Sequence, residues 1–411
     1  MFGDCTSVSE LDLSSFNGIN LVDTSGMFEY CENLNSIKFF DFDGKKITNI
    51  NNMFFNCKNL TYLDLTSFNF SEITDMSSLF FGCESLQSID FFNFIQSSAV
   101  NMNSMFYNCL SLTSLNLTTF KTSNVTNMEK MFYNCKNLSA IDFSSFDTKN
   151  VEYMNQMFYS CISLNSLIGQ NFDTTSVKDM SQMFYKCTSL ESLDLSNFRT
   201  PSLENMDLMF TNCTSLKSLS VINFNTEKVT NMSIVFKNCI KLSTLDLSSF
   251  NTSNIDNMEE LFYNCEQLFY LNIDNFDTSK VTTMNSLFYN CKKLKPLNLK
   301  SFDTSNVVDM GNMFYLCKNL TELDISNFNT SQVTNMGGMF LSCSNLKSLN
   351  LNSLDTRKVK NMTKMLKDCS VLVDLKVNNF DVSEVLTMDS MFENCKKILF
   401  LNLSSFYTPK V

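Results

Sequence analysis

The spacing of the cysteines constrains this chain more than any other feature. All 16 of them stand 26 residues apart, from Cys5 to Cys395, without a single insertion or deletion. A fixed period of about 20–50 residues is typical of solenoids, in which each repeat stacks on its neighbours. Conventional domains joined by linkers would not keep such a register. We therefore predict that residues 1–411 form a single repeat solenoid whose repeats begin at each Cys.

Other residue types follow the same period. We number the columns of the repeat from each Cys, so that column +6 lies six residues after it. Column +6 is Leu or Ile in all 16 repeats, and columns +11 and +23 are Phe in 15 of 16 repeats each. All 25 Met occupy columns +19 and +22. The composition is thus one 26-residue pattern repeated about sixteen times, and we predict that these columns form one continuous core.

Two hydrophobic periods lie inside each repeat. Around columns +6 and +8 apolar and polar residues alternate, as in Leu193-Asp194-Leu195, which indicates a short strand with one buried face. Columns +19, +22, +23 and the next Cys have the i, i+3, i+4, i+7 spacing of one helix face. Asn or Asp precedes that run at column +18 in 12 of 15 repeats, where a helix N-cap belongs. The sequence predicts an α/β repeat: a leucine-rich-repeat-like solenoid of about sixteen stacked turns, each a short strand plus a short helix.

Composition argues against several classes of function. The absence of His removes the commonest general base and metal ligand, and a net charge of −11 with a pI near 4.7 argues against a nucleic-acid partner. No apolar run approaches the length of a membrane span. Every candidate reactive residue recurs as a column, whereas an active site needs one singular constellation. We predict a protein that is not an enzyme, with no catalytic residues and no cofactor.

The cysteines and tyrosines have structural interpretations. There is no CxxC pair, and zinc sites need ligands clustered at short spacing, so we predict no metal site. Buried thiols that act as small apolar residues are the favoured interpretation of the Cys column, and disulfides between neighbouring turns are the alternative. Column +24 carries a recurring Tyr, which we interpret as a half-buried stripe rather than a binding stripe. The tyrosines of this column are Tyr107, Tyr133, Tyr159, Tyr185, Tyr263, Tyr289 and Tyr315.

The outward strand positions are where we expect binding, because solenoids bind through extended strand faces. Column +7 carries an acidic ladder that either holds Ca²⁺ or a basic partner, or is simply a solvated face. Its members are Asp12, Asp64, Asp90, Asp142, Asp194, Asp246 and Asp324. Outward aromatic residues stand at Phe40, Tyr62 and Phe92 in adjacent repeats, where they mark a partner site or lie under an N-terminal cap. Replacing Phe40 and Phe92 with Ser is expected to abolish partner binding without unfolding the chain.

Two segments carry a resemblance to a known family. Leu138-Ser-Ala-Ile-Asp-Phe-Ser-Ser-Phe-Asp-Thr148 and Val125-Thr-Asn-Met-Glu-Lys-Met-Phe-Tyr-Asn-Cys135 resemble the BspA-like leucine-rich repeat family. Its repeat reads much like L-x-x-L-D-L-S-x-F-D-T-S-x-V-x-x-M-x-x-M-F-x-x-C. The resemblance implies a surface or extracellular protein of bacteria or protists that adheres to host cells, matrix proteins or other microbes, through a protein or glycan ligand. It supplies no catalytic residues.

Both ends fall inside a repeat, with Met1 in column +22 and Val411 in column +16. We expect either an excerpt of a longer protein or ends that stack on one another. The predicted function is a non-enzymatic cell-surface or extracellular repeat protein that mediates adhesion or protein–protein interaction through its strand face. The alternative is a structural subunit of a filament formed by end-to-end stacking. An intracellular scaffold is a third interpretation, suggested by a ladder of free thiols.

Overall fold

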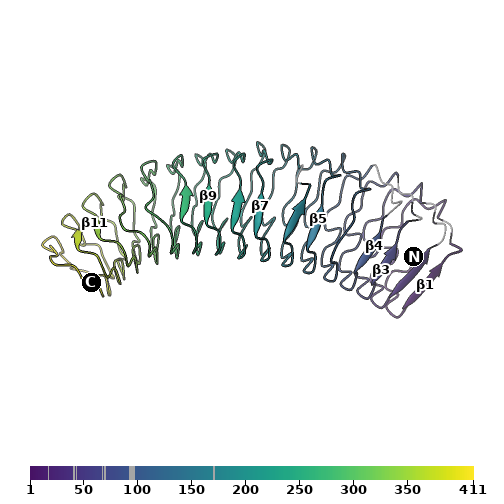
Figure 1. Ribbon diagram of the computed structural model, residues 1–411, viewed down its shortest axis with the longest axis horizontal. Helices are drawn as coiled ribbons and strands as arrows, with labels where there is room; N and C mark the ends of the chain where they lie inside the picture. Colours follow the sequence, from purple (N-terminus) through teal and green to yellow (C-terminus); the bar gives the residue numbers. More distant parts are fainter. Residues whose placement is uncertain are drawn as a thin grey trace. The chain divides into compact units, whose positions relative to one another are not determined.

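The chain forms two compact units, Met1–Leu203 (unit 1) and Glu204–Val411 (unit 2). The structure is a computed structural model, and it describes residues 1–16, 18–39, 42, 44–66, 68, 71–91, 98–169 and 172–411. Within each unit, successive 26-residue coils stack so that their strands lie side by side (Figure 1). The predicted repeat is therefore the structural unit of the fold.

Each strand is short and begins near column +5. The strands of unit 1 are β1 (Glu10–Leu13), β2 (Ser36–Phe39), β3 (Tyr62–Asp64), β4 (Ser88–Asp90), β5 (Ala140–Asp142), β6 (Ser166–Ile168) and β7 (Ser192–Asp194). Those of unit 2 are β8 (Ser218–Ser220), β9 (Thr244–Asp246), β10 (Tyr270–Asn272), β11 (Ser348–Asn350) and β12 (Asp374–Lys376). Paired strands are parallel and offset by one repeat, as where Leu11 lies opposite Ile37 and Leu245 opposite Leu271. The predicted strand is confirmed at column +6 in these repeats, whereas column +8 belongs to the strand only in β1 and β2.

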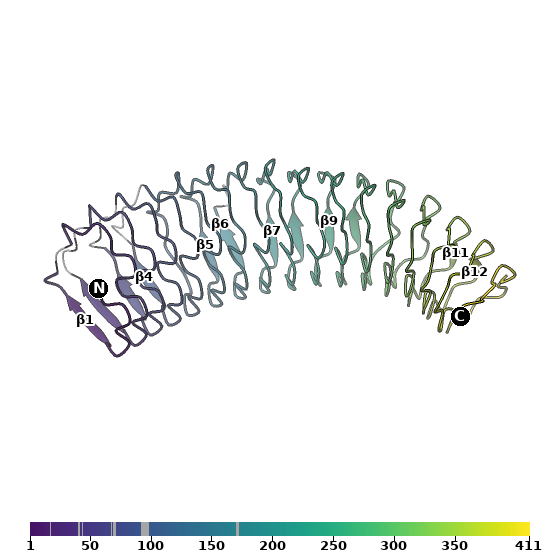
Figure 2. The same cartoon turned by 180° about the vertical axis from the view of Figure 1, so that it is seen from behind.

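The predicted helix is wrong. The described residues contain no helix, and the fold is a parallel β-solenoid of about 14 turns rather than about sixteen strand–helix turns. The view from behind shows the returning part of each coil as an open trace of turns (Figure 2). At the outermost coils Met1, Leu399 and Phe400 are 81%, 88% and 77% exposed.

Hydrogen bonding to the next coil explains why no helix forms. In the returning segment Met128, Lys130 and Phe132 donate their backbone N–H groups to carbonyls 25 residues later, at 2.9–3.0 Å. The residues between them close β-turns, because Met131 N–H bonds to the Met128 carbonyl and Cys135 N–H to the Phe132 carbonyl. An α-helix would need all of these N–H groups for bonds to the residue four places earlier. Consecutive β-turns place side chains with the same i, i+3, i+4, i+7 spacing as one face of a helix. The backbone N–H groups bond to the next coil instead of forming helical bonds.

These turns are the device by which a chain with only nine Gly changes direction so often. Residues with positive φ recur in columns +21 and +25, such as Lys130 at 55° and Asn134 at 60°. Type II turns need a positive φ at their third residue, a conformation that disfavours most side chains. The positive φ is maintained in each coil because the N–H groups of these residues donate hydrogen bonds to carbonyls of the next coil. The Asx residues of column +18, such as Asn127, accept the N–H two residues later, so they begin turns instead of helices.

The core is built from the predicted columns. Phe rings of column +23 stack face to face along each unit, with centroids 5.4 Å apart between Phe106 and Phe132 and 5.7 Å apart between Phe236 and Phe262. Met128 and Met131 of the two Met columns are fully buried beside them. The prediction that these columns form the core is confirmed.

All 16 cysteines are free thiols, and all but Cys5 and Cys395 are buried. Each buried thiol whose bond is described donates to the carbonyl of a column +23 residue in the preceding coil, as Cys109 does to Phe80 at 3.2 Å and Cys265 to Phe236 at 3.2 Å. The favoured interpretation of the Cys column therefore agrees with the structure, with an inter-coil hydrogen bond added to its apolar role.

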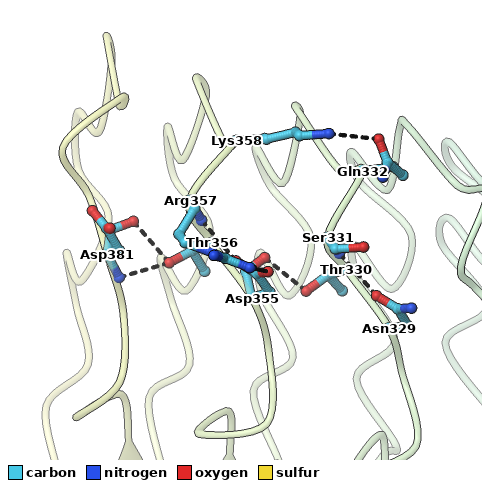
Figure 3. A network of polar contacts seen from close by, with 9 residues as sticks. All are labelled: Asn329, Thr330, Ser331, Gln332, Asp355, Thr356, Arg357, Lys358 and Asp381. Atoms are coloured by element: carbon cyan, nitrogen blue, oxygen red, sulfur yellow. Dashed lines mark hydrogen bonds and ion pairs between the residues drawn. The ribbon is translucent and has the colours of Figure 1, made fainter.

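A threonine ladder in column +13 was not predicted from the sequence. Thr330 and Thr356 are almost fully buried, and their hydroxyls donate to the carbonyls of Asp355 and Asp381 in the next coil at 2.9 and 2.8 Å (Figure 3). The N–H of Asp381 in turn donates to the Thr356 hydroxyl at 2.8 Å. A Thr that recurs every 26 residues was the signal in the sequence, because a buried hydroxyl needs a partner.

Candidate binding site on the strand face

The acidic ladder of column +7 lies at the ends of the strands. Asp12 is in β1, and Asp64, Asp90, Asp142, Asp194 and Asp246 are the last residues of β3, β4, β5, β7 and β9. Asp324 occupies the same column outside any assigned strand. All seven are exposed or half-buried, as predicted for an outward position. Five belong to unit 1 and two to unit 2, so the ladder is concentrated in unit 1.

Most of these carboxylates have a local structural partner. The backbone N–H of Ser14, Ser144 and Ser326 each donates to the Oδ1 of the aspartate two residues earlier, at 2.8–3.0 Å. Hydrogen bonds from these serines hold the pKa of Asp12, Asp142 and Asp324 below its ordinary value. The column therefore ends each strand with an Asx turn. This turn uses one carboxylate oxygen and leaves the side chain charged on the surface.

Two members of the ladder and one predicted aromatic residue come together in unit 1. The parallel pairing of β3 with β4 puts Asp64 opposite Asp90 and Tyr62 opposite Ser88. A hollow of about 540 Å³ opens here, and its wall includes Tyr62, Asp90 and Asn116. Tyr62 is 50% exposed. Here a predicted aromatic residue and a predicted acidic residue, Tyr62 and Asp90, line the same hollow.

The electrostatics of this hollow are negative. Burial, followed by the charges of Asp64 and Asp90, raises the pKa of the Tyr62 phenol, which therefore stays neutral and able to donate a hydrogen bond. Like charges directly opposite each other in a sheet repel. The pair Asp64–Asp90 is thus a surface at which a cationic group is favoured, and the ring of Tyr62 offers an apolar contact beside it.

The other predicted site residues either do not line the Tyr62 hollow or lie outside the described residues. Phe40 and Phe92 lie outside the described residues. Asp12, Asp142 and Asp194 belong to other coils of unit 1, and Asp246 and Asp324 to unit 2, so they do not join the Tyr62 hollow. Across the described part of the chain, no three acidic or Cys side chains gather closely enough to hold a metal ion.

The tyrosines of column +24 form an extended stack. Tyr107, Tyr133 and Tyr159 are half-buried, with ring centroids 4.4 Å apart at both steps and interplanar angles of 4–5°. Burial, followed by the neighbouring phenols, raises the pKa of Tyr133. The predicted half-burial of these tyrosines is confirmed, and they lie on turns. The stack holds neighbouring coils together.

No helix of the described residues is long and apolar enough to cross a membrane.

The stacked parallel strands, the turn-rich return of each coil and an outward strand face define the class: a parallel β-solenoid of leucine-rich-repeat type. Segments 1–114, 100–219, 190–297 and 282–406 match the family described as "Mycoplasma protein of unknown function, DUF285". These segments cover nearly the whole chain, and the chain belongs to that family. No curated protein matches it.

Solved structures with a similar fold include several bacterial leucine-rich repeat proteins. One from Bacteroides ovatus is 18% identical, with 86% of this chain and 76% of that chain covered and a TM-score of 0.45. A leucine-rich cell surface protein from Faecalibacterium prausnitzii is 14% identical, with 90% and 83% covered and a TM-score of 0.33. An internalin from Listeria monocytogenes is 21% identical, with 83% and 86% covered and a TM-score of 0.29. At these identities and TM-scores none of them carries an argument about function.

Proposed function

We propose that this chain is a non-enzymatic repeat protein that binds another protein through the strand face of unit 1, at a cell surface or outside the cell. The observation that carries the proposal is the hollow beside the half-exposed Tyr62, flanked by the aligned carboxylates of Asp64 and Asp90. Exposed aromatic side chains are enriched at protein interfaces and account for much of their binding energy. The partner that fits is a protein surface with a Lys or Arg side chain beside an apolar group.

The net charge of unit 1 also favours a partner with a basic surface. Residues 1–203 contain 11 Lys and Arg against 21 Asp and Glu, so unit 1 is strongly acidic. A surface potential of one sign steers an oppositely charged partner and raises its association rate at low ionic strength. The strand pairing keeps Tyr62 and Asp90 in fixed positions, so little order has to be gained on binding.

The test is adhesion of the purified, labelled chain to fixed epithelial monolayers and to basement-membrane matrix. We expect Tyr62→Ser combined with Asp90→Asn to reduce binding about tenfold or more, since truncating an interface aromatic costs about 1–2 kcal/mol or more. Tyr153→Ser is the matched control, because Tyr153 is 40% exposed in column +18, away from the strands. Binding that is equal in both variants, or absent from the unaltered chain, would contradict the proposal.

End-to-end self-association into a filament stays the alternative prediction. Light scattering against protein concentration tests it, because stacking raises the scattering mass with concentration, whereas a binding module of fixed size does not.

A further inference from the structure

A second surface, in unit 2, carries a cluster of lysines, whereas the surface of unit 1 is acidic. Residues 204–411 contain 20 Lys and Arg against 21 Asp and Glu, so unit 2 is nearly neutral overall. Its lysines are not evenly spread. Columns +2 and +4, which lie between each Cys and the following strand, hold no Asp or Glu in unit 2. The lysines in these two columns are Lys217, Lys241, Lys293, Lys295, Lys347 and Lys397.

The same two columns in unit 1 contain no Lys or Arg, and their only charged residue is Glu191. The lysines are therefore a local departure from the repeat pattern and not a consequence of it. Core packing does not require them, because every one of these lysines is exposed. Residues that break a repeat on its surface are where a repeat protein acquires an individual binding specificity.

Three of these lysines line one hollow. It measures about 570 Å³ and crosses the coils from Cys213 to Cys317. Its wall consists of Lys217, Lys241, Ser243, Gln267, Phe269, Lys293 and Asn319, with no carboxylate among them. Phe269 is 43% exposed, and the Lys295 ammonium lies 5.7 Å from its ring centroid. The hollow thus combines cations, neutral hydrogen-bonding groups and one apolar ring.

The charges of Lys241 and Lys293, the two lysines on which the binding argument depends, are not neutralised by a neighbouring carboxylate of the described residues. The nearby Glu266 is already paired with Lys292, Nζ to Oε2 at 2.8 Å. Within the described chain, neither Lys241 nor Lys293 has an ion-pair partner. The backbone beneath is held in place, because the N–H of Phe269 donates to the Ser243 carbonyl at 3.0 Å. The hollow therefore presents positive charge on a rigid base.

We propose that this hollow binds a linear anionic glycan, through Lys241 and Lys293 on its acidic groups and through Gln267, Ser243 and Asn319 on its hydroxyls. Phe269 would contact the apolar face of a sugar ring. With about 4.8 Å between coils, the four steps from the Cys213 coil to the Cys317 coil give a trough of roughly 19 Å, enough for a few sugar residues. This site is separate from the Tyr62 hollow and does not depend on the function proposed for it.

Two other polyanions fit less well. A peptide that binds solenoid strands by adding to a sheet needs a free strand edge. Here β9 pairs with both β8 and β10, so neither side of β9 is open. Nucleic-acid grooves combine a basic face, usually with Arg, and several stacking aromatic residues. The wall of this hollow has no Arg and one aromatic residue.

The experiment measures the affinity of the whole chain for a fluorescent heparin oligosaccharide by anisotropy, at 50 and 300 mM NaCl. Poly-glutamate, single-stranded DNA and neutral dextran are the comparison ligands. We expect heparin to bind most tightly, dextran not at all, and the affinity to fall at higher salt because exposed charges are screened. Lys241→Gln with Lys293→Gln should weaken heparin binding about tenfold, as expected for two exposed charge contacts.

The matched control is Lys228→Gln with Lys360→Gln, which removes the same charge from exposed positions outside columns +2 and +4. It should change the affinity less than twofold. An equal loss in both double variants would show only unspecific attraction and overturn the assignment. Tighter binding of poly-glutamate or single-stranded DNA would reassign the hollow to an acidic peptide or a nucleic acid, and an absence of heparin binding would remove the site. Phe269→Ser, which leaves the charge unchanged, should weaken heparin binding at both salt concentrations.

Discussion

At the scale of single residues, the buried cysteines show how one side chain serves two purposes in this fold. The thiol of Cys161 fills core volume and donates to the Phe132 carbonyl at 3.0 Å. Burial raises the pKa of Cys161 to about 12, so the group stays protonated at neutral pH. A thiolate is the nucleophilic form of Cys, and these side chains are therefore chemically inert in the folded chain.

The raised thiol pKa predicts that the protein loses stability in alkali. Burial also raises the pKa of Cys265 and Cys343 to about 12, whereas exposed thiols in the unfolded chain ionise near pH 9. Below about pH 9 both states are protonated and the stability is intact. Between about pH 9 and 12 these thiols lose their protons only in the unfolded chain, so the free energy of unfolding falls. Urea denaturation at pH 7.5, 9.5 and 10.5 measures it, and constant stability over this range would contradict the prediction.

The column +7 aspartates illustrate why a surface pattern alone does not identify a site. Asp142 and Asp324 recur at the period of the fold because each one forms an Asx turn at the same place in its coil. At Asp90 a hollow with an exposed aromatic side chain, Tyr62, adjoins the carboxylate. The ladder was visible in the sequence, and the difference between its members was not.

At the scale of the coil, the returning segment holds most of the backbone strain. Asparagine suits positive φ better than other non-glycine residues, and column +25 uses it repeatedly. The amide of Asn264 donates to the Oδ1 of Asn238 at 2.9 Å, and the amide of Asn290 donates to Asn264. The next coil has Leu316 instead, at φ 59°. Among the described residues the buried Oδ1 of Asn290 has no hydrogen-bond partner.

Leu316→Asn should therefore stabilise the protein. Asparagine relieves about 1 kcal/mol of strain at positive φ, and its amide gives Asn290 the missing donor, worth about another 1 kcal/mol. Leu316→Asp is the matched control, because Asp also tolerates the positive φ of this position but its carboxylate has no N–H to donate to Asn290. The free energy of unfolding from urea titration should rise more for Leu316→Asn than for Leu316→Asp. A loss of stability at Leu316 would argue against the amide ladder.

The helix prediction failed at this same scale. The spacing of Met128, Met131, Phe132 and Cys135 places four side chains on one side of a helix, and it does the same on consecutive β-turns. The spacing indicates which side chains face the core, but it does not indicate which carbonyl accepts each backbone N–H bond. The acceptors are carbonyls of the neighbouring coil, 25 residues later, and a local sequence pattern does not predict them.

At the scale of the whole molecule, the proposal that residues 1–411 form a single solenoid has a measurable consequence. Stability in a solenoid spreads through contacts between neighbouring repeats, so unfolding is cooperative over many of them. Phe132→Ala in unit 1 and Phe236→Ala in unit 2 each remove a fully buried ring, at a cost of about 3–5 kcal/mol. We expect one calorimetric transition that both substitutions move to lower temperature. Two transitions, each moved by only one substitution, would contradict the single-solenoid proposal.

Charge is also distributed at this scale. Unit 1 carries nearly all of the net negative charge, and unit 2 has a lysine-lined hollow in a nearly neutral surface. The total of −11 conceals this difference, and for that reason the composition argued only against a nucleic-acid partner and not for an anionic glycan. The lysines of columns +2 and +4 were available in the sequence, but their shared hollow required the stacking of coils.

The sequence by itself determined the repeat, the strand positions and the buried columns, because a 26-residue period reports which side chains must face a common core in every coil. It also placed Tyr62 and Asp90 on an outward face. The tertiary structure alone decided that the returning segment is a series of turns and which surface residues meet in a hollow. The physical reason is that the turns and the hollows both depend on contacts between residues about one repeat apart in the chain. These inter-coil hydrogen bonds and side-chain contacts form only when the coils stack.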